Sequence, residues 1–241
     1  MPERARWHGP VDTSHHAVVP LHALIFDAAG TLTRPLLELF ARQVEGAPFD
    51  ARQAGMVLYQ AVQQEGDDDS LPHRCERGEV PLDELVAWVE AQSPGAGAMI
   101  DPASPHFLLG RLAWSEPMLA LLADARSAGR PTAIISNQFA GWSDTFGAAV
   151  TALGADEVVI SADVGLRKPD LAIYRLACSR LGVEPPDALF LDDALAMADG
   201  ARQAGLTAIH VTDHDAAAAE ARALLGLGRA TPPAVAAPQA P

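Results

Sequence analysis

The chain alternates short apolar runs with longer amphipathic segments over most of its length. Five apolar runs are short enough to be buried strands: 21–26, 132–135, 158–160, 188–191 and 207–211. Four segments have the apolar periodicity of helices: 116–128, 170–181, 194–204 and 215–225. A glycine follows each of these helices, where a helix C-terminus favours positive φ. This alternation predicts an α/β fold with a doubly wound parallel sheet.

The alternation fails only between residues 34 and 115. Apolar residues there recur at helical spacing in three places, around 36–44, 56–62 and 82–89, and Asp50 is placed to cap the second of these helices. We therefore expect residues 34–115 to be an all-helical cap inserted into an α/β core of residues 21–33 and 116–227. Ligands of such sheets bind beyond the carboxyl ends of the strands, so the insertion is expected to lie over the ligand site.

Charge and chain ends restrict the possible partners. The chain carries 31 acidic and 17 basic side chains, a net charge of −14, which repels nucleic acids and anionic membranes. It lacks an apolar run of 18 residues or a signal-peptide core, and its two cysteines are too few for a disulfide framework. We expect a cytoplasmic protein with reduced thiols, a flexible leader at 1–20 and a disordered Pro/Ala-rich tail at 228–241.

Polar residues follow the predicted strands where a ligand would bind. Asp27 ends the first strand and is followed by Gly30 and Thr31, so its carboxylate could attack a substrate while the turn amides face an anion. An aspartate that only caps the next helix would look similar. The second strand ends in Ser136 and Asn137, whose side chains can donate to an oxyanion, although a polar turn is also typical there.

The remaining strand ends supply charge. Lys168 precedes a predicted helix and is the chain's single lysine beside 16 arginines, which indicates a chemical need for a compact ammonium. Asp192 and Asp193 end the fourth strand. Together with Asp27 they would repel one another unless a cation lay among them, and Mg²⁺ prefers such oxygen ligands. A solvated turn is the alternative for the acidic pair.

In combination these segments form a phosphoryl-transfer constellation. The sequence resembles the haloacid dehalogenase (HAD) superfamily of hydrolases, whose four motifs occur in order as Asp27 with Gly30-Thr31, Ser136-Asn137, Lys168-Pro169 and Asp192-Asp193. The resemblance spans roughly residues 21–212. It implies a Rossmann-like core with a helical cap and a phosphoryl-enzyme intermediate on Asp27. It also implies catalytic Asp27 and Lys168, phosphate contacts from Thr31, Ser136 and Asn137, and Mg²⁺ held by Asp27, Asp192, Asp193 and the main-chain carbonyl of Ala29.

The chain departs from the superfamily pattern at two positions. Phosphatases of the superfamily usually carry a second aspartate two residues after the nucleophile, where this chain has Ala29. That aspartate moves protons, and general acid–base help is typically worth about 10²- to 10⁴-fold in rate. Met197 stands where relatives often have Asn or Asp. A cap residue such as His73, Glu79 or His106 could replace the missing acid, but no sequence pattern favours one of these three over the others.

Three relatives also lack the second aspartate. Phosphonoacetaldehyde hydrolases are similar at the first motif but use a cap lysine, and this cap has none. Ion-pumping ATPases need membrane helices, for which this chain has no apolar run of 18 residues. Haloacid dehalogenases need no Mg²⁺, whereas the Asp192-Asp193 pair is expected to bind it. We therefore predict a Mg²⁺-dependent hydrolase of a small phosphorylated metabolite. The alternatives are a catalytically weakened module that binds a phosphorylated ligand or a protein, and a phosphonate or haloacid hydrolase. The sequence leaves the substrate and the oligomeric state open.

Overall fold

The computed structural model describes residues 21–43, 50, 53–57, 69–110 and 113–228. Its centre is one parallel sheet in the order β3-β2-β1-β4-β5. The strands are β1 (Ala23–Phe26), β2 (Thr132–Ser136), β3 (Glu157–Ile160), β4 (Ala188–Asp192) and β5 (Thr207–His210). The predicted α/β class and the five predicted strands are confirmed. The second and fourth strands each run one residue further than expected, so Ser136 and Asp192 lie inside the sheet.

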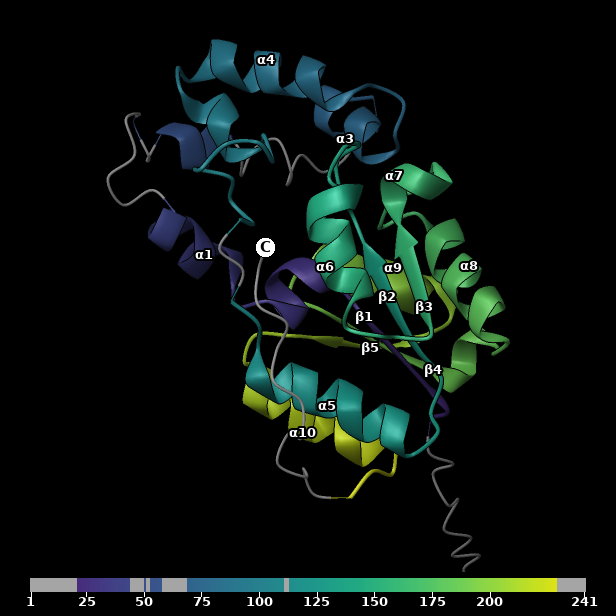
Figure 1. Cartoon of the computed structure of the whole chain (residues 1–241). Coiled ribbons are helices and arrows are strands. Elements are labelled where there is room, and N and C mark those ends of the chain that lie inside the picture. Colours follow the sequence, from purple (N-terminus) through teal and green to yellow (C-terminus); the bar gives the residue numbers. More distant parts are fainter. Residues whose placement is uncertain (1–20, 44–49, 51–52, 58–68, 111–112, 229–241) are drawn as a thin grey trace, which may run out of the picture.

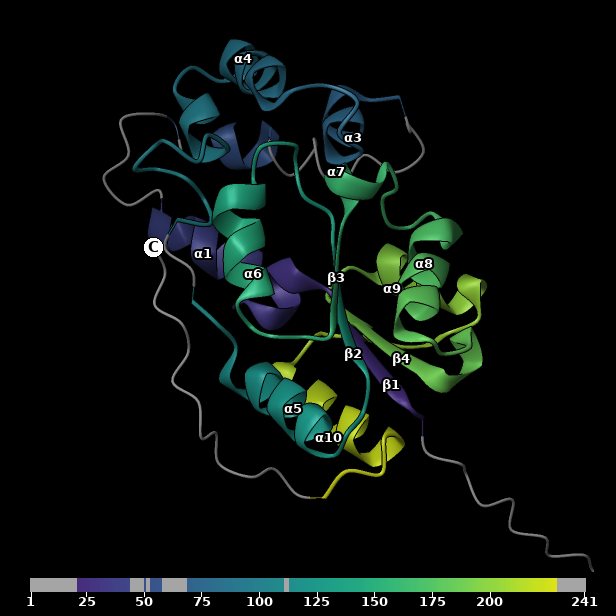
Figure 2. The ribbon, with the colours of Figure 1, turned by 45° about the vertical axis from the view of Figure 1, so that its right-hand side comes forward.

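Helices cover both faces of the sheet, which explains the apolar strand sequences. Every residue of β1, β2 and β4 is buried. Helices α5 (Glu116–Ser127) and α10 (His214–Leu224) pack on one face, and α8 (Leu171–Leu181) and α9 (Leu195–Ala204) pack on the other (Figures 1 and 2). All four agree with the predicted helices within two residues at each end. Each face thus has its own apolar core.

The regular elements described between β1 and α5 are helices, joined by turns. It contains α1 (Leu36–Gln43), a helical stretch at 53–57, α3 (Leu71–Glu76), α4 (Leu82–Gln92) and a short 3₁₀ helix (Ala96–Met99). The Asp50 carboxylate accepts a hydrogen bond from the amide of Gln53 at 3.0 Å, as expected of a cap. The other expected positions of that second helix from residue 58 onward, and Val44, lie outside the described residues. Figure 1 shows α3 and α4 beyond the carboxyl ends of the strands.

Two short helices follow β2 and β3: α6 (Ala148–Thr151) lies alongside the sheet, and α7 (Ser161–Val164) lies next to α3 of the insertion (Figures 1 and 2). Within the described residues, no helix is both long and apolar enough to cross a membrane. Cys75 and Cys178 are buried free thiols. The expected leader, and the expected tail from residue 229, lie outside the described part of the chain.

Candidate active site

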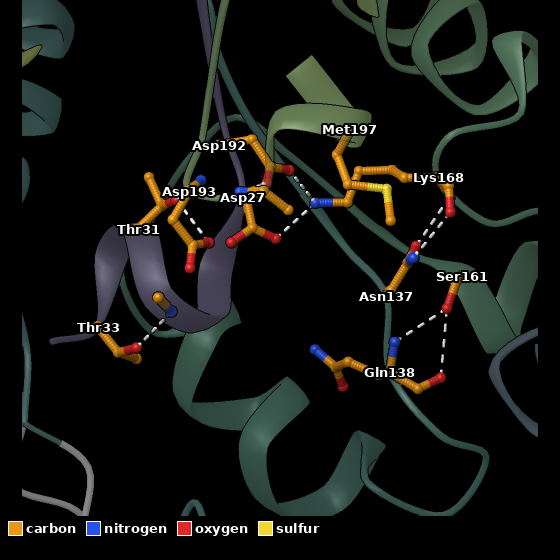
Figure 3. A network of polar contacts seen from close by, with 12 residues as sticks. Asp27, Thr31, Thr33, Asn137, Gln138, Ser161, Lys168, Asp192, Asp193 and Met197 are labelled. Carbon is orange, nitrogen blue, oxygen red and sulfur yellow. Dashed lines mark hydrogen bonds and ion pairs between the residues drawn. The ribbon is translucent and has the colours of Figure 1, made fainter. Parts of the chain in front are cut away.

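Residues far apart in the sequence meet at the carboxyl edge of the sheet (Figure 3). The register pairs Phe26 with Leu191, so Asp27, directly after β1, and Asp192, the last residue of β4, lie at the same level. Lys168 lies between them: its Nζ is 2.5 Å from Oδ1 of Asp27 and 2.6 Å from Oδ2 of Asp192. All three side chains are almost fully buried. The proximity of these three motifs, expected from the sequence, is therefore observed.

Three carboxylates crowd around this one ammonium. Asp27, Asp192 and Asp193 each offer an oxygen, and these oxygens lie within 4.8 Å of one another. Burial raises the pKa of Asp27 to about 8, against the opposing charge of Lys168. Burial and the charge of Asp192 raise the pKa of Asp193 to about 6. The cluster thus holds more negative charge than Lys168 neutralises, which is the electrostatic condition for binding a further cation.

Asn137 fixes the main chain of Lys168. Its Oδ1 accepts a hydrogen bond from the Lys168 amide at 2.9 Å, and its Nδ2 donates to the Lys168 carbonyl at 3.0 Å. Although burial works against the charged ammonium, the carboxylates of Asp192 and Asp27 raise the pKa of Lys168 above its ordinary value. Lys168 is thus held as a cation in a fixed position. With both ends of its amide so engaged, Asn137 positions Lys168 in this structure, and its phosphate contact stays a prediction.

The turn after β1 requires glycine at position 30. This turn (Ala28–Leu32) has Gly30 at φ 100°, and a Cβ there would overlap the carboxylate of Asp193. The Gly30 amide donates to Thr33 Oγ1 at 2.8 Å. The sequence pattern at Gly30 therefore has two physical causes, a left-handed backbone and the close approach of the fourth motif.

Thr31 joins the turn to the acidic pair. Its hydroxyl accepts a hydrogen bond from the Asp193 amide at 3.1 Å and donates to Asp193 Oδ1 at 3.5 Å. Thr31 is fully buried. The side chain expected to contact phosphate thus holds Asp193 in this structure, and direct phosphate contact by Thr31 stays a prediction.

Several buried polar atoms at the strand ends lack a hydrogen-bond partner within the described chain. They are Oδ2 of Asp27, Oγ of Ser136 and both amide atoms of Gln138. Buried polar groups are normally paired, so such atoms at a candidate site indicate a ligand. Ser136 therefore stays a predicted phosphate contact, with a free hydroxyl to make it. Gln138 was not singled out in the sequence.

Two histidines that the sequence analysis did not single out support the site from the C-terminal part of the chain. His214 Nε2 lies 3.0 Å from the carbonyl oxygen of Gly30, and its Nδ1 lies 2.7 Å from Ser115 Oγ. His210 Nε2 lies 3.1 Å from the carbonyl oxygen of Asp193. Because a carbonyl oxygen only accepts, both Nε2 atoms carry the proton. His210 ends β5 and His214 begins α10, so their positions near the end of the fifth strand are a sequence signal that could have found them.

The helical insertion is joined to the core beside the site. Arg167, next to Lys168, pairs with Glu76 of α3 at 2.7 Å, and both side chains are buried. The Ala140 amide donates to the carbonyl of Cys75 at 3.0 Å, and the Trp142 indole donates to the carbonyl of Ile100 at 2.9 Å. The loops after β2 and before α8 therefore carry both site residues and contacts with the insertion.

Glu79, one of the candidates for a replacement acid, is engaged in ion pairs. Glu79 pairs with Arg77 and Arg74, and the hydrogen bond from Arg77 lowers its pKa. A general acid at neutral pH needs a raised pKa, so Glu79 is unsuited to the task.

Met197 offers only a thioether and lies beside Lys168 in Figure 3. Its main-chain carbonyl accepts a hydrogen bond from the hydroxyl of Tyr174 at 2.7 Å.

Comparison with known proteins agrees with this arrangement. Residues 21–205 match the haloacid dehalogenase-like hydrolase family. The chain belongs to this family. It is accordingly a HAD-like hydrolase with a Rossmann-like α/β fold, as the four motifs predicted.

Relatives and solved structures show how far the likeness extends. The chain is 27% identical over 230 residues to bifunctional epoxide hydrolase 2 of Sus scrofa, covering 89% of this chain and 40% of that protein. It is 43% identical over 83 residues to validoxylamine A 7'-phosphate phosphatase of Streptomyces hygroscopicus subsp. limoneus, covering 32% of this chain and 39% of that protein. The chain thus spans less than half of these relatives. A dehalogenase crystallised as an intermediate complex shares the fold, with a TM-score of 0.62, 20% identity and coverage of 86% and 97% of the two chains.

Proposed function

We propose that this HAD-like hydrolase is a Mg²⁺-dependent phosphatase of a small phosphorylated metabolite. The observation that carries the proposal is the buried cluster of Asp27, Asp192, Asp193 and Lys168, with the unpartnered hydroxyl of Ser136 on the neighbouring strand. A carboxylate nucleophile, a fixed ammonium, a hydroxyl donor and a set of acidic ligands are the groups that phosphoryl transfer requires. The phosphatase among the relatives supports the same chemistry.

The acidic cluster fits a magnesium ion. Its ligand atoms are carboxylate oxygens, which Mg²⁺ prefers, and Oδ2 of Asp27 is a buried acceptor without a partner. Asp27, Asp193, Asp192 and the main-chain carbonyl of Ala29 would hold the ion. Bound there, Mg²⁺ would supply positive charge to an anionic nucleophile and an anionic phosphoryl group that otherwise repel each other.

The protein's own residues account for the first chemical step. A carboxylate oxygen of Asp27 attacks phosphorus, the bond from phosphorus to the leaving oxygen breaks, and an aspartyl phosphate forms. Lys168 neutralises charge on Asp27 and on the transferred group, and Ser136 donates to a phosphoryl oxygen. Asn137 and Thr31 keep Lys168 and Asp193 in position. Water then cleaves the aspartyl phosphate, releasing phosphate and restoring Asp27.

Proton transfer is the weak part of this site. The leaving oxygen needs a proton, and Ala29 presents a methyl group where a second aspartate would provide one. If no cap residue such as His73 or His106 supplies it, the proton comes from water, and we expect slow turnover. If turnover is lost altogether, the same groups would still bind a phosphorylated ligand, which is the second candidate function that Ala29 favours.

A comparison of the parent with Asp27→Asn tests the phosphatase. We expect the parent to hydrolyse 4-nitrophenyl phosphate only with Mg²⁺, and Asp27→Asn to lose at least about 10²-fold in kcat, because an amide is a poor nucleophile. Mg²⁺ should also raise Tm in the parent more than in Asp193→Asn, since that variant loses a ligand.

Three outcomes would contradict the proposal. Equal rates in the parent and Asp27→Asn would assign the turnover to background. Metal-independent release of chloride from 2-chloropropionate, without phosphate release from any ester, would assign a haloacid hydrolase instead. Saturable binding of phosphate without turnover would favour the binding function.

A further inference from the structure

Gln138 is a buried side chain whose polar atoms have no partner in the described chain. The residue is 1% exposed, and both its Oε1 and its Nε2 lack a hydrogen bond. A carboxamide that leaves water without gaining partners destabilises the fold. Such a group is retained where something outside the protein satisfies it.

The main chain of Gln138 is held firmly. Its amide donates to Oγ of Ser161 at 2.9 Å, and that hydroxyl donates back to the Gln138 carbonyl at 3.2 Å. The side-chain Oε1 lies against Gly147, since a Cβ built on that glycine would come within 3.2 Å of it. The carboxamide is therefore buried on a fixed main chain and is not a surface group.

The direction of Gln138 follows from strand geometry. Side chains two residues apart in an extended chain share a face, so Gln138 is expected on the face of Ser136, and Asn137 on the opposite one. Asn137 bonds the main chain of Lys168, whereas the side chains of Ser136 and Gln138 have no hydrogen-bond partner within the described chain. In Figure 3 the carboxamide points away from Ser161, toward the side where Asp27 lies.

Gln138 stands further from the sheet than the phosphate-binding groups. The chain runs from Ser136, at the end of β2, to Ala140, whose amide donates to the Cys75 carbonyl of the insertion, so Gln138 lies between the sheet and the insertion. In-line attack by Asp27 would expel the leaving group on the side of phosphorus away from Asp27, and we place Gln138 on that side. The Gln138 carboxamide both donates and accepts, which complements an alcohol hydroxyl.

We propose that Gln138 binds the leaving group of the substrate and selects phosphate esters that carry a hydroxyl close to the ester oxygen. This inference rests on the proposed phosphatase function. An ester without that hydroxyl would leave the buried carboxamide unpaired in the complex, and sites built to pair with a hydroxyl reject analogues that lack it.

Two esters of equal chain length test the selection, glycerol 1-phosphate and propyl phosphate. In the parent we expect the ratio of their kcat/KM values to favour glycerol 1-phosphate by about tenfold or more. Gln138→Met keeps the side-chain length and removes both polar atoms, so the ratio should fall toward one. Gln203→Met is the matched control, because Gln203 is an exposed glutamine on α9, and its ratio should equal that of the parent.

Thermal unfolding of the free protein separates binding from a structural role. Replacing an unpartnered buried carboxamide by an apolar side chain should leave Tm unchanged or raise it. A fall in Tm for Gln138→Met would assign Gln138 to the fold. An unchanged ester ratio would overturn the selection while leaving the phosphatase intact. Absence of hydrolysis of both esters by a parent that still hydrolyses 4-nitrophenyl phosphate would overturn the selection alone, whereas absence of hydrolysis of all three esters would overturn the phosphatase as well.

Discussion

Ala29 shows how one side chain separates binding from turnover in this site. The metal ligand expected at this position is a main-chain carbonyl, which a methyl side chain leaves in place. The proton-transferring carboxyl is what the sequence lacks. Around it, Gly30, Thr31 and Asp193 keep the contacts that shape the turn. At the scale of the residue, the deficit is therefore confined to acid–base chemistry.

Restoring the acid tests this interpretation. We expect Ala29→Asp to raise kcat for 4-nitrophenyl phosphate modestly and for an alkyl phosphate by about 10²-fold or more, because an alkoxide needs protonation more than a nitrophenolate does. Steady-state kinetics with both esters would measure the difference. An equal change for both substrates would show that the carboxyl acts through something other than proton transfer. Ala29→Asn, which has the same shape but no titratable proton, is the control.

At the scale of elements, α3 is linked to the loop that carries Lys168. The ion pair of Glu76 with Arg167 is buried. The ion pair of Glu38 in α1 with Arg34, which lies just before that helix, is about half exposed. Buried pairs are costly to break because the remaining charge has no solvent, and exposed pairs contribute little. The insertion therefore has one strong electrostatic contact with the catalytic edge.

Removal of one partner from each pair gives a direct comparison. Glu76→Gln should lower the free energy of unfolding by about 3–5 kcal/mol, and Glu38→Gln by less than about 0.5 kcal/mol. Urea denaturation monitored by circular dichroism measures both. Since Arg167 precedes Lys168, kcat/KM should also fall in Glu76→Gln alone. Equal, small losses in the free energy of unfolding of the two variants would show that the buried pair stabilises the fold no more than the exposed pair does.

At the scale of the whole molecule, two buried free thiols make the free energy of unfolding depend on pH in the alkaline range. Burial raises the pKa of Cys75 and of Cys178 to about 11, whereas a thiol of the unfolded chain titrates near 9.0. Between these values the unfolded state has lost protons that the folded state keeps. The free energy of unfolding must therefore fall as pH rises from about 9 to 11.

Denaturation at pH 7.5, 9 and 10.5 tests this linkage. We expect a loss on the order of 1–2 kcal/mol for each thiol by pH 10.5, with little change below pH 8. The double variant of Cys75→Ala with Cys178→Ala has a different starting stability, so the slopes against pH are compared. A slope as steep in the double variant as in the parent would assign the alkaline loss to other groups.

The sequence by itself determined the fold class and the edge of the sheet where the site lies. Apolar strands alternating with helices form a parallel sheet, and a parallel sheet brings the carboxyl ends of its strands together. Asp27, Lys168, Asp192 and Asp193 were therefore predictable as neighbours from local pattern alone. The helical nature of the insertion was predictable for the same reason, since periodicity is a local property.

Only the tertiary structure decided which partner each polar side chain takes. The pairing of Thr31 with Asp193, of Asn137 with the main chain of Lys168, and of Glu76 with Arg167 joins residues 31 to 162 positions apart. Hydrogen bonds and ion pairs depend on distances of a few tenths of an ångström, which packing sets and sequence spacing does not. The same packing buries the carboxamide of Gln138 without a hydrogen-bond partner in the described chain, which leaves it available to bind the leaving group.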